Sequence, residues 1–230
     1  MAFDKILIAG VVSIFAGIDR TAMWQFMLSR PIVAAPLIGL LLGEPATGLL
    51  VGGLVELLWL GRLPVGAAIP PDDTQVAIGG TALAVIVGQH LQIGGPAFTL
   101  LAVIIALPLG KVGQIFDRMA RLRNGRLLEK VNGAVLEGRL EGIDRLHLMG
   151  IGHFALSSLA TFTIIFVSGT VLLSWSAPLL LKPVEQSYRW LALLLPCVGA
   201  GSILGTVNVS RKVTLFTASF ITVFLTLWLL

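Results

Sequence analysis

Long stretches without a charged residue constrain this 230-residue chain more than any other feature of its sequence. Lys, Arg, Asp and Glu are all absent from residues 74–110, 146–181, 190–210 and 213–230. A helix crosses the hydrocarbon core of a bilayer with roughly 20 apolar residues, so each stretch is long enough for a span. Charged residues make up 12% of the chain, against about 25% in soluble domains. We therefore expect an all-α integral membrane protein.

The apolar start of the chain, residues 1–20, has the length and hydropathy of a signal peptide. Asp4 stands in the region that a signal peptide keeps basic, and further apolar sequence follows, so we expect an uncleaved first helix. Cys197 is the only cysteine, which excludes an internal disulfide and a metal site built from several cysteines. We predict no cofactor and no metal. Membrane topology accounts for the net charge of +4, so we also predict no nucleic-acid partner.

Half of the basic residues lie in one segment: residues 111–145 hold eight of the sixteen Lys and Arg. Loops rich in Lys and Arg stay on the cytoplasmic side, so this segment is predicted to be cytoplasmic. Helices at 149–173, 190–207 and 213–230 would then run outward, inward and outward. The chain is expected to divide into three regions: an N-terminal membrane region with broken helices and a candidate binding site (1–113), a basic amphipathic segment (114–148) and C-terminal transmembrane helices (149–230).

Apolar segments in the N-terminal half are too short or too interrupted for simple spans. Residues 31–43 reach only ~20 Å as a helix, against a hydrocarbon core of ~30 Å. Pro70 and Pro71 prevent a regular helix over 63–71, and the sequence GQHLQIGGP (88–96) splits the long uncharged run. These breaks predict a polytopic helical bundle with broken or re-entrant helices in the N-terminal half. In secondary transporters such breaks flank the substrate site.

Gly48, Gly52 and Glu56 recur at intervals of four residues and so share one face of a helix. The two glycines permit the close approach of another helix, and Glu56 then lies along the same contact. An ionisable group at membrane depth costs a few kcal/mol and by default marks a pathway or a binding site. The alternative is a structural role, in which Glu56 only accepts a hydrogen bond from the neighbouring helix.

The sequence GAAIPPDDTQ (66–75) places two carboxylates directly after a double proline. The prolines favour extended backbone before a helix. Asp72 or Asp73 would cap that helix near Thr74, and Gln75 stands at the capping-box spacing from Asp72. Capping alone would explain both acids. A helix N-terminus at membrane depth is also a polar binding feature, so Asp72 is equally a candidate ligand contact.

A long and irregular motif runs through residues 29–114. It comprises Arg30-Pro31, Glu44, Thr47-Gly48, Gly52-Gly53 with Glu56, Gly61, Gly66-Ala67-Ala68 with Pro71-Asp72, and Gly113-Gln114. This motif resembles the IIC subunit of the mannose/fructose/sorbose family of bacterial phosphoenolpyruvate-dependent sugar phosphotransferase systems. The rest of the chain agrees with that family only in hydropathy.

The resemblance implies a multi-pass sugar permease subunit in the bacterial inner membrane that binds a hexose or an amino sugar. It also implies a second membrane subunit, IID, and soluble IIA and IIB subunits that carry the phosphoryl group from phosphoenolpyruvate to the sugar. A homo-oligomer of IIC–IID units is expected. Such a subunit is not catalytic alone and forms no phospho-intermediate, in keeping with the three isolated histidines of this chain.

Sugar hydroxyls need carboxylate and amide partners, so the candidate substrate-binding residues are polar residues of the N-terminal half and its boundary. Glu56 and Asp72 lead. The further candidates are Asp73, Gln25, Gln89 and Gln114. Asp73 stands where the family has a small residue, and Gln25 stands where other members have an acid, so both positions bear on which sugar is bound.

Two other functions remain open on the sequence. An intramembrane hydrolase needs paired acids, but Asp72 and Asp73 are adjacent and point apart, and no activated nucleophile accompanies Glu56. A non-transporting membrane scaffold or regulatory remnant would use these acids as caps and packing groups.

The segment 114–148 is predicted to form one or two amphipathic surface helices that rest on lipid head groups, dock the IIB subunit or contact IID.

Overall fold

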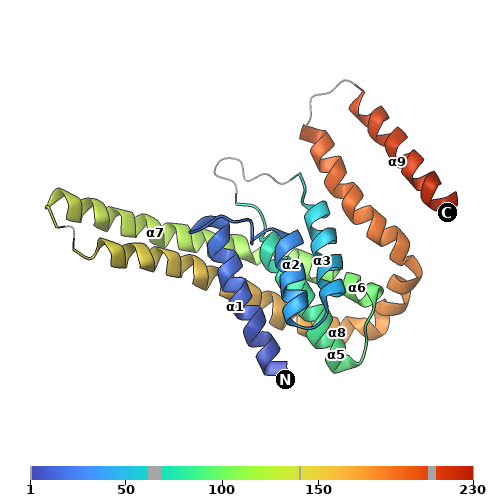
Figure 1. Ribbon diagram of the computed structural model, residues 1–230, viewed down its shortest axis with the longest axis horizontal. Coiled ribbons are helices and arrows are strands. Elements are labelled where there is room, and N and C mark those ends of the chain that lie inside the picture. The colour runs from blue at the N-terminus through green and yellow to red at the C-terminus, as the bar shows by residue number, and fades with distance from the viewer. Residues whose placement is uncertain (1, 62–68, 140, 207–210, 230) are drawn as a thin grey trace.

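The computed structural model describes residues 2–61, 69–139, 141–206 and 211–229. Within these ranges all regular structure is helical, which confirms the predicted all-α class. Figure 1 shows a central group of helices, a two-helix arm on one side and the C-terminal helices on the other. The elements are α1 (Ala2–Thr21), α2 (Pro31–Leu41), α3 (Pro45–Leu58), α4 (Asp73–Ala82), the π-helical turn η1 (Leu83–Val87), α5 (Gly88–Leu91), α6 (Pro96–Leu109), α7 (Val112–Leu136), α8 (Ile143–Thr206) and α9 (Lys212–Leu229).

The centre of the molecule is the helical run Asp73–Leu91, which α4, η1 and α5 form together. Every residue from 74 to 88 is buried. α4 packs against α1, α2, α3, α6 and α8, so no face of it is left for solvent. An uncharged sequence suits a helix that is surrounded in this way.

α2 and α3 form a tight helical pair that lies side by side (Figure 1). A Cβ atom on Gly48 would lie 2.3 Å from the carbonyl oxygen of Ala35, so only glycine permits this approach. Gly52 contacts α2 in the same way, with Pro31 O at 2.8 Å from an added Cβ. The two helices have 11 and 14 residues, which confirms that this part of the chain forms short helices rather than full spans.

The long uncharged run breaks where the sequence predicted. α5 ends at Gln92, whose backbone is left-handed with φ +55°, and α6 begins with a proline after Gly95 at φ +94°. Of the predicted irregular segment 63–71, residues 69–71 are outside any helix, and the remainder lies outside the described residues.

α7 and the first part of α8 form the arm of the molecule (Figure 1). α7 has 25 residues and confirms a helix in the predicted amphipathic segment. It continues the direction of α6 with a bend of 42°. Gly138 and Gly142, at φ +71° and +86°, lie in the turn that leads into α8.

The prediction of separate helices at 149–173 and 190–207 is wrong, because α8 is one helix of 64 residues that includes the stretch between them. Pro178, Pro183 and Pro196 lie inside it. A proline removes one backbone donor and bends a helix without necessarily ending it, and α8 changes direction along its length (Figure 1). A straight helix of this length would extend ~96 Å, about three hydrocarbon cores.

By length and composition, three helical runs within the described residues are able to cross a membrane: Asp73–Leu91, Ile143–Gly205 and Lys212–Leu229. The bent pair of Pro96–Leu109 and Val112–Leu136 qualifies as one further, broken span. α9 has no buried residue and contacts α8 through the stacked rings of Phe224 and Trp190, 5.7 Å apart. The protein is therefore a multi-pass membrane protein whose N-terminal half contains short and broken helices.

Candidate functional site

Asp72 is the N-cap of α4, as the capping-box spacing predicted. Its Oδ1 atom accepts a hydrogen bond from the backbone N–H of Gln75 at 3.0 Å, which satisfies one of the first unpaired donors of the helix. Asp73 accepts a hydrogen bond from the backbone N–H of Thr74 at 3.0 Å. Both carboxylates thus stand at the end of a helix dipole that favours negative charge.

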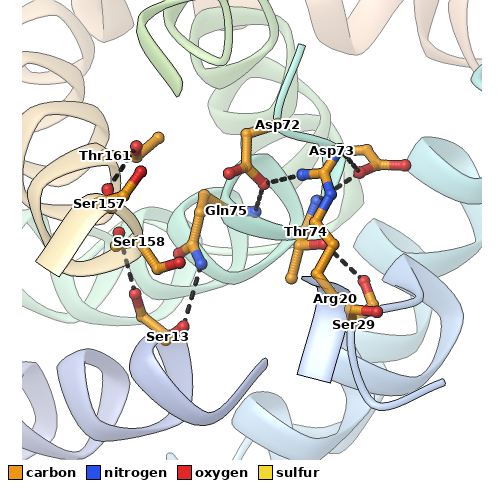
Figure 2. A network of polar contacts seen from close by, with 10 residues as sticks. All are labelled: Ser13, Arg20, Ser29, Asp72, Asp73, Thr74, Gln75, Ser157, Ser158 and Thr161. Atoms are coloured by element: carbon orange, nitrogen blue, oxygen red, sulfur yellow. Dashed lines mark hydrogen bonds and ion pairs between the residues drawn. The ribbon is translucent and has the colours of Figure 1, made fainter. Parts of the chain in front are cut away.

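Arg20 joins the two acids through one guanidinium group (Figure 2). Its Nη1 atom lies 2.6 Å from Asp72 Oδ1, and its Nη2 atom lies 3.4 Å from Asp73 Oδ1. Arg20 occupies the last turn of α1, where the helix dipole favours a cation. Sequence analysis missed this residue, because its only signal was a charge at the end of the first apolar run.

Asp19, the neighbour of Arg20, holds the loop between α1 and α2 in place. This residue is 1% exposed. Its carboxylate accepts hydrogen bonds from the backbone N–H of Phe26 at 2.7 Å and of Ser29 at 3.1 Å. The carbonyl oxygen of Ser29 in turn accepts a hydrogen bond from the Thr74 hydroxyl at 2.7 Å (Figure 2). The loop is therefore tied to the start of α4.

Glu56 lies on the face of α3 that contacts α2, as predicted. Its carboxylate forms an ion pair with Arg30 and accepts a hydrogen bond from the backbone N–H of Ile32 at 3.3 Å. The side chain of Glu56 is 12% exposed, whereas that of Arg30 is 54% exposed. The contact expected of a structural Glu56 is present, and the same residue also lines a cavity.

A cavity of about 650 Å³ brings these groups together where α1, α3 and α4 meet the base of α7 and α8. Small-molecule sites have volumes of roughly 300–1,000 Å³. The charged residues that line it, among those described, comprise four carboxylates and three guanidinium groups. They are Arg20, Arg30, Glu56, Asp72, Asp73, Asp117 and Arg121. The indole of Trp59 and the ring of Phe154 add aromatic surface.

A buried polar seam behind the carboxylates joins α4 to α1 and α8 (Figure 2). The Gln75 side chain, which is fully buried, donates through Nε2 to the carbonyl oxygen of Ser13 at 3.0 Å. The Ser13 hydroxyl donates to the carbonyl oxygen of Ser158 at 3.3 Å. These bonds fix the N-terminal turn of α4, and with it Asp72, against the neighbouring helices.

Two of the predicted site residues lie away from the cavity. Gln25 is exposed in the loop between α1 and α2, with a left-handed backbone at φ +55°. Gln89 accepts a hydrogen bond from Lys5 Nζ at 2.7 Å, and the helical run places it ~24 Å along the axis from Asp73. The structure therefore does not bring Gln25 or Gln89 together with Glu56 and Asp72.

Gln114 lies beside the cavity without lining it. Its Nε2 atom donates to the carbonyl oxygen of Ile69 at 2.6 Å, which holds the segment before the double proline against α7. The arrangement at the cavity is suited to hydrogen bonding of a polar ligand, with carboxylate acceptors and guanidinium donors side by side. Within the described residues no group of three or more His, Cys, Asp or Glu side chains is placed to hold a metal ion.

Comparison with known proteins gives a family match over nearly the whole chain: the family EII-Sor, described as the PTS system sorbose-specific IIC component, matches residues 3–229. The sorbose-specific EIIC component of Klebsiella pneumoniae is 32% identical over 148 residues, 64% of this chain and 52% of that protein. The mannose-specific EIIC component of Escherichia coli K12 is 28% identical over 147 residues, with the same coverage. The chain spans about half the length of these curated relatives.

Solved structures show the same fold. One, described as a membrane protein, superposes with a TM-score of 0.73 at 22% identity over 95% of this chain and 85% of the other. The mannose transporter ManYZ, solved in complex with microcin E492, gives a TM-score of 0.62 at 22% identity over 97% and 87% of the two chains. With a family match that extends from residue 3 to residue 229, the chain belongs to the family of PTS sorbose-specific IIC components.

Proposed function

We propose that this chain is the membrane-embedded IIC permease subunit of a mannose-family sugar phosphotransferase system. It binds a hexose-type sugar in the cavity and translocates it for phosphorylation by a soluble IIB subunit. The observation that carries the proposal is the convergence of Glu56, Asp72 and Asp73 on one cavity in a chain of this family.

The chemistry of the cavity supports a sugar ligand. Carboxylate oxygens accept hydrogen bonds from sugar hydroxyls, and the guanidinium groups of Arg20 and Arg30 are able to donate to them. Arg20 and Arg30 hold the acceptors in fixed orientations before the ligand arrives, which lowers the entropic cost of binding. Trp59, which is largely buried, offers an aromatic surface to the C–H face of a sugar ring.

The proposal includes partners and an orientation. A IID membrane subunit completes the permease, IIA and IIB carry the phosphoryl group, and IIC–IID units form a homo-oligomer in the bacterial inner membrane. The basic segment 111–145, which the arm contains, is cytoplasmic because Lys and Arg in short loops stay inside. One structural relative is a mannose transporter, and curated relatives are sorbose- and mannose-specific components.

A non-transporting scaffold is the second candidate, and one observation favours it. Glu56, Asp72 and Asp73 are each paired with an arginine, as purely structural acids would be. On this account the same ion pairs would hold helices together, and no sugar would enter.

Equilibrium binding of radiolabelled sugars separates the two candidates. The purified chain, co-expressed with a IID partner, is titrated with mannose, fructose, glucose and N-acetylglucosamine. We expect saturable binding of at least one sugar, weakened roughly 10- to 100-fold in Glu56→Gln and in Asp72→Asn. Loss of a hydrogen bond to a charged group costs about 1.5–3 kcal/mol, which corresponds to this range.

The matched controls are Glu185→Gln and Asp144→Asn, which make the same chemical changes at exposed positions outside the cavity. Both should bind as the wild type does. If none of the four sugars binds saturably to a complex that elutes intact, the result favours the scaffold. Equal binding by the wild type and both cavity variants would move the sugar site elsewhere.

A further inference from the structure

Arg121 differs from the other two arginines at the cavity in what its guanidinium group contacts. Arg20 uses both terminal nitrogens on Asp72 and Asp73, and a terminal nitrogen of Arg30 is paired with Glu56. Arg121 contacts Asp117 through Nε alone, at 2.6 Å. Its two terminal nitrogens make no hydrogen bond within the described residues.

Two contacts hold this guanidinium group in a defined position. Asp117, one turn earlier on α7, fixes its Nε edge. The ring of Phe154 on α8 lies 5.8 Å from its central carbon, a distance at which a cation is attracted to an aromatic face. The side chain of Arg121 is nevertheless 52% exposed. The result is a preoriented fork of two N–H donors, which matches the geometry of a phosphate group.

The charges at the cavity favour a neutral ligand beside Glu56, Asp72 and Asp73. Four carboxylates and three arginines among the described lining residues leave a net charge of −1. Asp72, Asp73 and Glu56 would repel a phosphate ester, which carries a charge of about −1.5 to −2 near pH 7. Arg121 lies where the cavity meets the arm. The exposed residues Arg123, Arg126 and Lys130 lie further along α7, on a face about 140–200° around the helix axis from Arg121.

We propose that Arg121 contacts the phosphate group of a phosphosugar bound at the arm side of the cavity. The site carboxylates bind the neutral sugar, and Arg121 binds the phosphorylated product before its release. This assignment rests on the proposed sugar-transport function. It adds an anion subsite to the sugar site and divides the cavity between substrate and product.

Competition binding with two probes tests this subsite. The purified complex is titrated with mannose and with mannose 6-phosphate, using the wild type, Arg121→Gln and Arg121→Lys. We expect Arg121→Gln to weaken mannose 6-phosphate binding at least about tenfold and to change mannose binding less than about twofold. Arg121→Lys keeps the charge but not the planar fork, so its affinity for the phosphosugar should be intermediate.

Arg118→Gln is the matched control, since it removes one positive charge from an exposed position of the same helix outside the cavity. It should leave both affinities within about twofold, which excludes a general effect of arm charge. Equal losses of mannose and mannose 6-phosphate in Arg121→Gln would overturn the subsite, and so would unchanged binding of both.

Titration with inorganic phosphate tests the anion subsite independently of sugar binding. The readout is the broadening of the phosphate line in the 31P nuclear magnetic resonance spectrum. If no hexose binds the wild type, the transport function fails, but phosphate broadening that disappears in Arg121→Gln and persists in Arg118→Gln still supports an anion subsite. Broadening that is the same in all three proteins would overturn it.

Discussion

Two adjacent carboxylates repel each other unless a cation lies between them, and Arg20 supplies that cation for Asp72 and Asp73. Its side chain is 24% exposed, and that of Asp72 is 14% exposed, so solvent screens the pair only in part. The capping role of Asp72 does not compete with the ion pair, because Oδ1 accepts from both Arg20 and the backbone of Gln75. The core of the site is therefore the N-terminus of α4, whose two carboxylates are ion-paired with Arg20.

Arg20→Gln should lower the free energy of unfolding by about 2 kcal/mol, because it leaves two partly buried carboxylates uncompensated. Thermal unfolding in detergent, followed by tryptophan fluorescence, measures the change. The double variant Arg20→Gln/Asp73→Asn should recover part of the loss, since one carboxylate then loses its charge. An Arg20→Gln protein as stable as the wild type would show that the ion pair contributes nothing.

Contacts between residues close in sequence were predictable at the site, whereas contacts between residues far apart in sequence were not. The Asp72 cap was predictable because its partner, Gln75, lies three residues away and the spacing is a known helix-start pattern. The partner of the same carboxylate, Arg20, lies 52 residues away. Nothing local specifies such a pairing. For the same reason Gln89 was predicted at the site although it lies at the other end of a buried helix.

Close backbone contacts set the position of the helical pair α2–α3, and so of Glu56. The glycine spacing on α3 predicted this contact, because Gly48, Gly52 and Glu56 share one face of the helix. The partner helix was not specified by that pattern. The contact with α2 also explains why Glu56 reaches the backbone N–H of Ile32.

Gly48→Ala should therefore destabilise the protein by about 1–3 kcal/mol, the usual cost of overpacking a close contact. A methyl group there would lie 2.3 Å from the Ala35 carbonyl oxygen. Gly53→Ala is the matched control on the same helix, since an added Cβ at Gly53 meets nothing within 4 Å. It should be neutral or stabilising, because alanine is the better helix former. Equal melting temperatures for the two variants would refute the close contact as a determinant.

α8 shows why charged and proline-containing stretches mislead a sequence-based assignment. Lys182, Pro183 and Glu185 have the composition of a connecting loop between two spans. The backbone nevertheless stays helical through them, because a proline-induced bend lets a helix change direction without interrupting most of its hydrogen bonds.

Hydrogen–deuterium exchange measures this difference directly. If α8 is continuous, the amides of residues 184–189 should exchange as slowly as those in the neighbouring helical segments, because each is hydrogen-bonded within the helix. A connecting loop in this region would exchange within seconds, as exposed unpaired amides do, and would restore the expectation of two separate helices.

In the whole molecule, the charge distribution is the basis of the proposed orientation in the membrane. The arm carries the highest concentration of Lys and Arg in the chain, and residues at the base of this arm line the cavity. The all-α class and the multi-pass character were predictable from the uncharged stretches alone. How the short helices surround α4 was not, because hydropathy specifies burial but not the neighbour.

A single introduced cysteine tests the orientation. In the background Cys197→Ser, which removes the only native cysteine, Asn132→Cys places a thiol at an exposed position of α7. Because the arm is proposed to be cytoplasmic, a membrane-impermeant maleimide should label it in inside-out vesicles and leave it unlabelled in intact spheroplasts. Labelling in intact spheroplasts would place the arm outside and reverse the proposed topology.

A cryo-electron microscopy structure of the chain, in complex with its IID partner and at saturating concentration of the sugar that binds best, tests the sugar site directly. We expect sugar density within the cavity of about 650 Å³, in hydrogen-bond contact with Asp72 and Glu56. Ordered sugar density at another place in the complex, with the cavity holding only its ion pairs, would contradict it.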